Sequence, residues 1–405
     1  MKPIVRAGRM KPVHSDIRGP LFVEAMKRQK QGIDILKLNT GNPATFGFGL
    51  PDSIKNALME HMQDGVGYCD FKGMPQARQA ICDYETSKGI KGITPDDVFI
   101  GNGVSEVVSF ALTPLLNDGD EVLVPSPSYS LWGNSVYLED GKPVFYTCDE
   151  QANWYPDIQD IRSKITDKTK AIVIINPNNP TGVLYPKELL LEIIQIARES
   201  GLLIFADEIY DRLVMDGKQH ISLASLTEDV PVITLNGLSK SHCLCGYRCG
   251  WMVISGPREL TEDYRQGIIQ LTSLRLCANT LAQIVIPAAL DDMETPASMV
   301  RPGGRIYEQR EATVRELEKI DGLSFVKNDA AFYVFPKLDV KKFNITNDKQ
   351  FAHDLLDATN ILLVLGSGFD WKDPDHFRIV MLPQADILSD AIRRMGTFLD
   401  GYKQK

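Results

Sequence analysis

The chain has 405 residues, of which 43% are hydrophobic and 24% are charged, and it carries a formal net charge of −9. This length allows a large buried core divided between two domains, and the negative charge argues against nucleic acid or an anionic membrane surface as the main partner. The sequence contains neither a recognisable signal peptide nor an apolar run of about eighteen residues, so we expect a cytoplasmic protein without a membrane span.

The first fifty residues predict one helix, Pro20–Lys30, and one strand, Asp34–Asn39. From residue 98 to residue 255, short apolar runs alternate with amphipathic stretches. The predicted strands are Val98–Ile100, Glu121–Val124, Val144–Tyr146, Ala171–Ile175, Leu202–Ala206, Val232–Leu235 and Trp251–Ile254, and the predicted helices include Ser105–Leu116 and Lys187–Ser200. Several of these strands are apolar at nearly every position, which is typical of strands buried on both faces of a parallel sheet. The region therefore predicts an α/β fold with a mostly parallel central sheet flanked by helices.

After about residue 295 the pattern changes. Arg301–Ile320 predicts a long amphipathic helix, and a last helix is predicted at Gln384–Tyr402. The short strands predicted between them are Leu323–Val326, Ala331–Phe335, Ile361–Leu365 and Phe377–Met381. This mixture indicates a smaller α+β domain. The pattern alone does not decide where the first fifty residues pack; we assign residues 49–295 to a large domain and residues 1–48 with 296–405 to a small one.

One segment, Leu235–Trp251, combines a lysine and an arginine in a loop of small residues after a predicted strand. It reads L-N-G-L-S-K-S-H-C-L-C-G-Y-R-C-G-W, with Lys240 in the loop and Arg248 eight residues later. A lysine at the mouth of a sheet can form an imine with an aldehyde cofactor, and an arginine can hold that cofactor's phosphate. The segment therefore favours a pyridoxal-phosphate enzyme, and an exposed loop with two charges is the alternative.

Two polar motifs directly follow predicted strands, where α/β proteins bind ligands. The run N-P-N-N-P-T-G presents the amide of Asn179, although a rigid turn would use the same residues. Asp207 follows the strand Leu202–Ala206, and a buried carboxylate needs a cationic partner such as a protonated pyridine nitrogen. Tyr210 could then bond the phenolate oxygen of the same ring; a helix cap with a packed tyrosine is the alternative.

Two further motifs indicate anion binding. G-N-G-V-S-E, which begins at Gly101, lies between a strand and a helix, where backbone N–H groups and the hydroxyl of Ser105 can bind an anion; a capped turn is the alternative. Arg378 interrupts an apolar strand, and its guanidinium suits the carboxylate of an amino-acid substrate; a salt bridge within the domain is the alternative. Together, at successive strand ends, the motifs favour one ligand site.

These motifs, in this order, resemble fold-type I pyridoxal-phosphate enzymes of the aspartate aminotransferase family over nearly the whole chain. The segments D-I-R-G-P, L-N-T-G-N-P, G-Y-C-D-F-K-G and R-P-G-G-R-I-Y-E-Q-R are similar to those of the bacterial glutamate–pyruvate (alanine) aminotransferase branch. The resemblance implies a ping-pong transfer from L-alanine to 2-oxoglutarate, with amino acids and 2-oxo acids as partners. An aminotransferase of aspartate, aromatic or branched-chain specificity, or a C–S lyase on the same fold, is the alternative.

The resemblance also implies residue roles. Lys240 carries the Schiff base, Asp207 pairs with the pyridine nitrogen, and Tyr210 and Asn179 bond the ring oxygen. The remaining cofactor contacts that it implies are stacking by Tyr129 and phosphate binding by Val104, Ser105, Ser239 and Arg248. Tyr68 would reach the phosphate of the neighbouring subunit, which requires a homodimer.

For the substrate, the resemblance implies that Arg378 binds the carboxylate, helped by Asn179 and the backbone at Gly41. Arg18 is our candidate for the distal carboxylate of glutamate, because it lies in a segment that is near the substrate in the family. A salt bridge at the start of a helix is the alternative role for Arg18.

Three positions depart from the family pattern. Gly237 replaces a frequent serine or threonine, which removes one phosphate bond, and Ser15 stands where the branch usually has a tyrosine. His242-Cys243-Leu244-Cys245 replaces a more usual aromatic–arginine pair. The spacing of these cysteines matches no common zinc site, so we expect no metal. The seven cysteines of the chain are mostly isolated in sequence, which is typical of reduced thiols.

Overall fold

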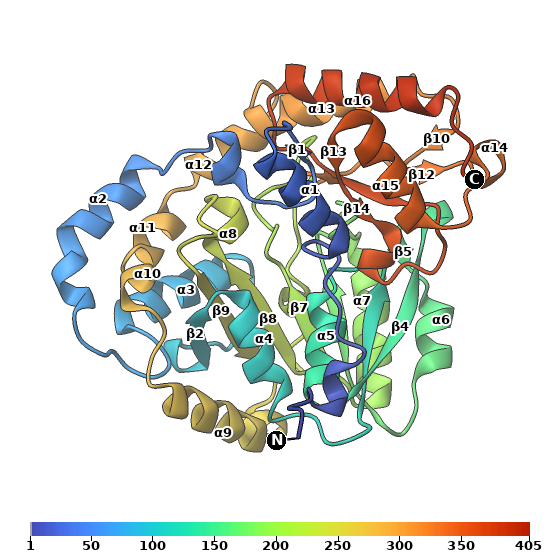
Figure 1. Cartoon of the computed structure of the whole chain (residues 1–405). Helices are drawn as coiled ribbons and strands as arrows, with labels where there is room; N and C mark the ends of the chain where they lie inside the picture. Colours follow the sequence, from blue (N-terminus) through green and yellow to red (C-terminus); the bar gives the residue numbers. More distant parts are fainter. Residues whose placement is uncertain (1) are drawn as a thin grey trace.

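The computed structural model describes residues 2–405, and its centre is an eight-stranded sheet (Figure 1). In spatial order the strands are β2 (Val98–Asn102), β9 (Cys249–Ser255), β8 (Val232–Gly237), β7 (Leu203–Asp207), β6 (Thr169–Ile175), β3 (Glu121–Ser126), β4 (Lys142–Asp149) and β5 (Tyr155–Pro156). The strands from β8 to β4 run parallel, whereas β9 pairs antiparallel with both β2 and β8, and β5 is antiparallel to β4. The prediction of an α/β fold with a mostly parallel central sheet is confirmed.

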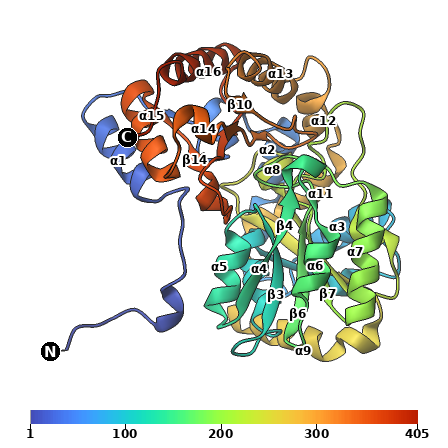
Figure 2. The ribbon, with the colours of Figure 1, turned by 90° about the vertical axis from the view of Figure 1, so that its right-hand side faces the viewer.

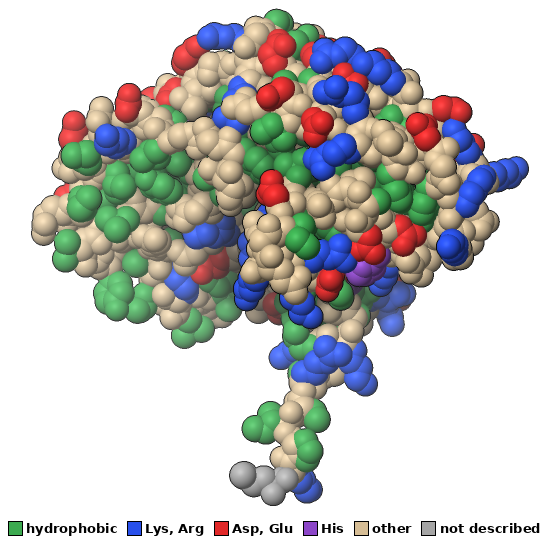
Figure 3. Space-filling model, turned by 45° about the horizontal axis from the view of Figure 1, so that its top comes forward, with side chains coloured by type: hydrophobic (Ala, Val, Ile, Leu, Met, Phe, Trp, Pro, Cys, Tyr) green, Lys and Arg blue, Asp and Glu red, His purple; other side chains and the backbone are tan. Residues whose placement is uncertain are grey.

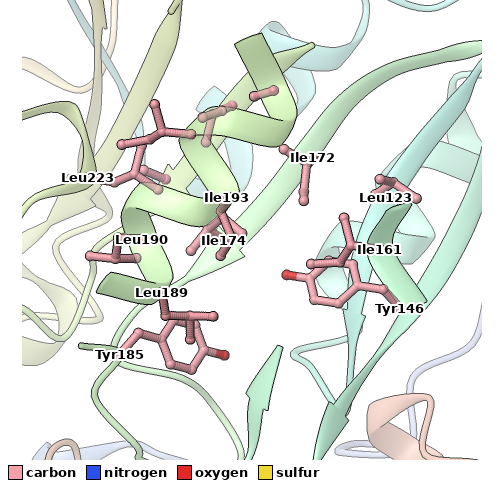
Figure 4. Packing of buried hydrophobic residues seen from close by; sticks show 14 of the residues in the cluster. Leu123, Tyr146, Ile161, Ile172, Ile174, Tyr185, Leu189, Leu190, Ile193 and Leu223 are labelled. Atoms are coloured by element: carbon pink, nitrogen blue, oxygen red, sulfur yellow. The ribbon is translucent and has the colours of Figure 1, made fainter. Parts of the chain in front are cut away.

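Helices cover both faces of this sheet. The helices of this part of the chain are α2 (Asp52–His61), α3 (Pro75–Ser87), α4 (Val104–Leu112), α5 (Leu131–Leu138), α6 (Ile158–Lys164), α7 (Lys187–Ser200), α8 (Leu238–Ser241), α9 (Arg258–Arg275), α10 (Thr280–Ile284) and α11 (Ile286–Asp291). Of these, α2 lies outside the sheet and packs on α10 and α11. Alternate residues of a strand point to opposite faces. Ile172 and Ile174 of β6 accordingly pack with Leu190 and Ile193 of α7 (Figure 4). Val173, between them, packs in the cluster formed with α4, α5 and α9. Because both faces are covered, these strands need apolar residues at every position.

The remaining elements form a second layer above the sheet (Figure 1). They are α1 (Pro20–Lys30), β1 (Leu36–Lys37), α12 (Glu294–Val300), α13 (Arg305–Leu317), β10 (Leu323–Ser324), β11 (Tyr333–Val334), β12 (Lys337–Leu338), α14 (Val340–Phe343), α15 (Asp348–Thr359), β13 (Ile361–Leu362), β14 (Val364–Leu365), β15 (Phe377–Val380) and α16 (Ala385–Leu399). β1 pairs in parallel with β13, and Leu38 belongs to the same buried cluster as residues of α15 and α16. The segment around β1 therefore packs with the C-terminal part of the chain.

Short 3-10 helices complete the described chain: η1 (Gly8–Met10), η2 (Pro43–Phe46), η3 (Met62–Gly65), η4 (Pro95–Asp97), η5 (Glu150–Ala152), η6 (Leu223–Leu226) and η7 (Gly366–Phe369). The segment that contains η1 extends away from the body as an arm (Figures 2 and 3). Ile4 and Val5 on this arm are almost fully exposed.

Several predicted boundaries were wrong in detail. The helix predicted from Arg301 begins at Arg305, because Arg301 is the extended C-cap of α12 and Gly303 has a φ of +82°. The strand predicted at Asp34–Asn39 is reduced to Leu36–Lys37, and the helix predicted to reach Leu116 ends at Leu112, just before Pro114. Within residues 2–405, no single helix is long and apolar enough to cross a membrane; α9 together with the helices after it, bent by 120°, meets that criterion as a pair.

Candidate active site

A cavity of about 520 Å³ opens where the parallel strands end, between the sheet and the second layer. Twelve residues that the sequence predicted for one site line this cavity: Arg18, Gly41, Val104, Ser105, Tyr129, Asn179, Asp207, Tyr210, Ser239, Lys240, Arg248 and Arg378. They come from the segments that follow β1, β3, β6, β7 and β8, from the start of α4, from β15, and from the residues just before α1 and β9. Parallel topology places the carboxyl ends of neighbouring strands at one edge, which explains why separate motifs meet.

Lys240 lies on α8, directly after β8. Its Nζ donates a hydrogen bond to the carbonyl oxygen of Gly41 at 3.0 Å. Glycines bring the surrounding backbone close: a Cβ on Gly237 would lie 2.5 Å from the oxygen of Cys249, and one on Gly250 would lie 2.4 Å from the nitrogen of Val104. The amine therefore projects from a tightly packed strand end and reaches a segment near the N-terminus.

Asp207 ends β7 and is a buried carboxylate that makes no ion pair within 4 Å among the described residues, although the charge of Lys240 attracts it weakly. Its Oδ2 accepts a hydrogen bond from Nε1 of Trp132 at 3.1 Å, and its Oδ1 lies 3.4 Å from the nitrogen of Ile209. Burial raises the pKa of Asp207 from its ordinary value of 3.8 to about 6, against the opposing effect of the Trp132 bond. A cationic group in the cavity would offset the free-energy cost of burying this carboxylate. The sequence around Trp132 did not indicate that its indole would hydrogen-bond to Asp207.

Arg378 is a buried cation whose partners are all uncharged in the part of the chain that the structure describes. Its Nη1 donates to Oδ1 of Asn179 at 2.9 Å, and its Nη2 donates to the carbonyl oxygen of Asn39 at 2.5 Å. Its Nε is buried without a hydrogen-bond partner. The guanidinium lies between the rings of Tyr333 at 4.5 Å and Phe369 at 4.7 Å, and burial lowers its pKa. The alternative prediction, that Arg378 forms a salt bridge within the domain, is therefore wrong.

Tyr210 is buried, and its hydroxyl lies 3.0 Å from the hydroxyl of Tyr333. Burial raises the pKa of Tyr210 well above its ordinary value, so the phenol stays protonated and can donate a hydrogen bond. Tyr333 also lines the cavity, but our reading of the sequence missed it, because Tyr333 stands in an ordinary strand pattern.

The start of α4 lines another polar part of the cavity. Gly103 caps the helix with a φ of +83°, and a Cβ there would lie 2.3 Å from Nη2 of Arg248. The guanidinium thus contacts the helix N-terminus, where Val104 and Ser105 present backbone N–H groups. Arg248 is exposed and donates to the carbonyl oxygen of Cys245 at 3.0 Å. A cation beside free N–H donors suits a phosphate group.

Tyr68 is the predicted residue that lies outside this cavity. Its side chain is 83% exposed and lines a separate groove with Asn102 and Asn279. Ser15 and Arg18 lie exposed at the rim of the main cavity, and in the described part of the molecule Arg18 makes no ion pair.

The thiol and imidazole groups after Lys240 diverge. His242 Nε2 lies 3.3 Å from the carbonyl oxygen of Asp292, Sγ of Cys243 lies 3.9 Å from Sδ of Met299, and Sγ of Cys245 lies 3.1 Å from Oδ1 of Asn42. They do not converge on one point.

Within residues 2–405, one group does bring potential metal ligands together: Glu208, Asp211 and His220. The Nζ of Lys88 lies 2.8 Å from Glu208 and 3.2 Å from Asp211, so a lysine already supplies the cation there.

Comparison with known proteins gives a consistent result. Residues 33–392 match the family described as aminotransferase class I and II. The chain is 50% identical, over the whole of both chains, to the glutamate–pyruvate aminotransferase AlaA of Haemophilus influenzae. It is 45% identical to an alanine aminotransferase of Mycobacterium tuberculosis, covering all of this chain and 94% of that protein.

Solved structures agree. An aminotransferase from Escherichia coli superposes with a TM-score of 0.98 at 47% identity, with both chains covered in full. An alanine aminotransferase from Pyrococcus furiosus gives a TM-score of 0.92 at 40% identity, covering 98% of this chain and all of that one.

Proposed function

From the premise that this chain belongs to the class I and II aminotransferase family, we propose that it uses pyridoxal 5′-phosphate to transfer the amino group of L-alanine to 2-oxoglutarate. The observation that carries the proposal is the pair of buried, unmatched charges in one cavity, Asp207 and Arg378, with the Lys240 amine in the same cavity. A cationic ring nitrogen and a substrate carboxylate would match these two charges. The names of the full-length relatives support the choice of alanine and glutamate.

The donors and acceptors in the cavity fit this cofactor. When bound, pyridoxal phosphate supplies an aldehyde that combines with amines and a ring that accepts electrons from the substrate's Cα. Asp207 would keep the ring nitrogen protonated, and Tyr210 and Asn179 would hold the ring oxygen. Tyr129 would stack on the ring. The phosphate would be held by the N-terminus of α4 with Val104 and Ser105, and by Ser239 and Arg248.

Lys240 has two tasks in this proposal. Its Nζ would hold the cofactor covalently through the cofactor's aldehyde group. Its Nζ would also take the proton from the substrate's Cα as a general base and give it up again, as a general acid, to the cofactor's former aldehyde carbon. With a second oxo acid the same residues would act in the reverse direction, which gives a ping-pong cycle.

Arg378 would bind the α-carboxylate of the substrate, with Asn179 and the backbone at Gly41 beside it. Tyr333 and Phe369 enclose its guanidinium, so its orientation is set before the substrate arrives. Such preorganisation aligns the Cα–H bond for proton transfer. Arg18 at the rim would contact the distal carboxylate of glutamate, which alanine lacks.

We also propose a homodimer. Exposed apolar residues gather over the face of α2, α10 and α11 (Figure 3): Met59, Met62, Val66, Tyr68, Leu276, Leu281 and Met293. A patch of this kind is typical of a protein interface. Tyr68 would then reach the phosphate site of the partner subunit, and the arm with Ile4 and Val5 would pack on the second copy.

The pairing of β1 with β13 supports the division into a large domain, residues 49–295, and a small domain, residues 1–48 and 296–405. The seven free cysteines support a cytoplasmic location, where thiols stay reduced.

A single-turnover screen tests the function. The cofactor-loaded protein is mixed with each common amino acid, and conversion to the amine form of the cofactor is followed by absorbance. Alanine and glutamate should react fastest; if a different pair reacts instead, or pyruvate appears with ammonia, the substrate assignment fails. Lys240→Ala should abolish both turnover and the imine absorbance. Lys91→Ala, which changes an exposed lysine, is the matched control.

A further inference from the structure

We propose that His14 and Asn134 form a clasp that holds the strap, residues 14–18, across the mouth of the cavity, and that this clasp selects the dicarboxylate substrate over alanine. The inference rests on the proposed function, because it gives the strap a role in binding the second carboxylate of glutamate. The strap lies between the extended arm and α1 (Figure 2). Ser15, Ile17 and Arg18 from it line the cavity.

The first part of the clasp is a single side chain on α5. Oδ1 of Asn134 accepts a hydrogen bond from the backbone nitrogen of His14 at 3.1 Å, and Nδ2 of Asn134 donates to the carbonyl oxygen of His14 at 2.6 Å. Both backbone polar groups of His14 are therefore used by one residue. A short side chain on a helix has few rotamers, so this pair fixes the position and the register of the strap.

The second part is the imidazole of His14, which lies between two carboxylates. Its Nδ1 is 3.3 Å from Oδ2 of Asp16, and its Nε2 is 3.2 Å from Oδ1 of Asp370. Hydrogen bonds to Asp16 and Asp370 raise the pKa of His14 to about 10, so the ring is a cation at neutral pH. Asp370 is itself held, because its carbonyl oxygen accepts a bond from Oγ of Ser126 at 2.7 Å.

The clasp thus joins the strap to both layers of the fold. Asn134 belongs to a helix on the central sheet, whereas Asp370 directly follows η7 of the second layer. Phe369, the last residue of η7, lies against the guanidinium of Arg378 at 4.7 Å. The element that holds His14 therefore also shapes the site for the first carboxylate.

The far end of the strap is tied to the same arginine. Nδ2 of Asn39 donates to the carbonyl oxygen of Ile17 at 2.9 Å, and the carbonyl oxygen of Asn39 accepts the bond from Arg378. Arg18 follows directly, exposed and without an ion pair among the residues that the structure describes. Its backbone is anchored on the preceding residues while its guanidinium is free to bind.

This combination suits a second carboxylate. A free segment would lose conformational entropy when it became ordered around bound glutamate. Because the backbone of Arg18 is already anchored, most of this entropy loss is avoided. Alanine has no second carboxylate to reach Arg18, so its binding depends less on the strap than the binding of glutamate does. His14 and Asn134 are therefore positioning residues, and they act through Arg18.

Two variants of the holoenzyme test the clasp: His14→Ala removes the ionic part, and Asn134→Ala removes the backbone ties. In each variant, we expect KM for glutamate and 2-oxoglutarate to rise about tenfold, which is the change in affinity that the loss of one or two hydrogen bonds produces. KM for alanine should change less than about twofold, and kcat should stay the same. Arg9→Ala, which breaks an exposed ion pair with Asp140 further along the arm, is the matched control and should change neither KM.

A second readout does not depend on activity. Trypsin cleaves after arginine, and the bond between Arg18 and Gly19 is protected while the strap is held. Mass spectrometry should detect the fragment that begins at Gly19 several times faster in both variants than in the parent or in Arg9→Ala. Unchanged cleavage overturns the clasp. Faster cleavage with equal changes in KM for glutamate and alanine overturns its role in selection.

The two proposals fail separately. If the parent enzyme converts neither alanine nor glutamate, the proposed function fails, and the selection role fails with it. The cleavage rates at Arg18–Gly19 still decide whether His14 and Asn134 hold the strap.

Discussion

Asp207→Asn is expected to stabilise the cofactor-free protein while it removes the activity of the loaded enzyme. The carboxylate of Asp207 is buried, and within residues 2–405 no cation pairs with it. Trp132 and the backbone of Ile209 supply its hydrogen bonds, and an asparagine side-chain oxygen can accept the bond from Trp132 equally well. The variant therefore removes a buried charge and keeps its best contact.

The magnitude follows from the pKa of Asp207, which burial raises from 3.8 to about 6. A difference of about 2 pH units corresponds to about 3 kcal/mol. Since the folded pKa is the higher one, the folded state binds the proton more tightly than the unfolded state does. The cost is absent below about pH 4, grows as the pH rises to about 6, and is complete above that value.

Urea unfolding of the cofactor-free parent and variant between about pH 4.5 and pH 7.5 measures this cost. The variant should gain up to about 3 kcal/mol over the parent as the pH rises, and the difference should level off above about pH 6. Asp118→Asn, at an exposed position, is the control and should give a difference that does not vary with pH. A constant difference for Asp207→Asn, or a parent that gains stability over the variant with rising pH, would refute the reasoning.

In the cofactor-loaded enzyme, the substitution should be unfavourable rather than stabilising. A protonated ring nitrogen would give the Asp207 carboxylate the cation that it lacks, so the parent should bind pyridoxal phosphate more tightly than Asp207→Asn does. Equilibrium dialysis of the cofactor against both proteins measures this difference. Equal affinities would show that Asp207 does not face the ring nitrogen.

Three other substitutions have defined outcomes. Arg18→Ala should raise KM for glutamate much more than KM for alanine in steady-state assays, and equal losses would remove Arg18 from the distal site. Arg378→Lys should raise KM for both amino acids about 100-fold, because an ammonium cannot replace a guanidinium fork held between two rings; a change limited to glutamate would contradict its role. Gly237→Ser should destabilise the fold by about 1–3 kcal/mol, because its Cβ would lie 2.5 Å from the oxygen of Cys249, and an unchanged melting temperature would contradict this.

Much of the candidate site could be predicted from the sequence because its residues directly follow strands. The apolar runs before Asp207 and Lys240 marked two strands of a parallel sheet, and the carboxyl ends of such strands share one edge. Asn179, in the loop after β6, reaches the same edge. The family resemblance then supplied the expected roles, including that of Arg378.

Contacts between segments that are far apart in the chain could not be predicted from the sequence. Trp132 and Tyr333 stand in ordinary apolar patterns, and nothing in those patterns indicates that they meet Asp207 and Tyr210. His14 likewise gave no local signal, although its ring lies between carboxylates of the strap and of the second layer.

The sequence by itself determined the α/β class, the strand positions and the motifs at the strand ends, because periodicity and turn chemistry act over a few neighbouring residues. Only the tertiary structure decided that β1 pairs with β13, that Asn39 connects the strap to Arg378, and that Asp207 makes no ion pair within the described chain. Such facts depend on how side chains from distant segments pack together and on what burial does to their charges, and no local pattern records either.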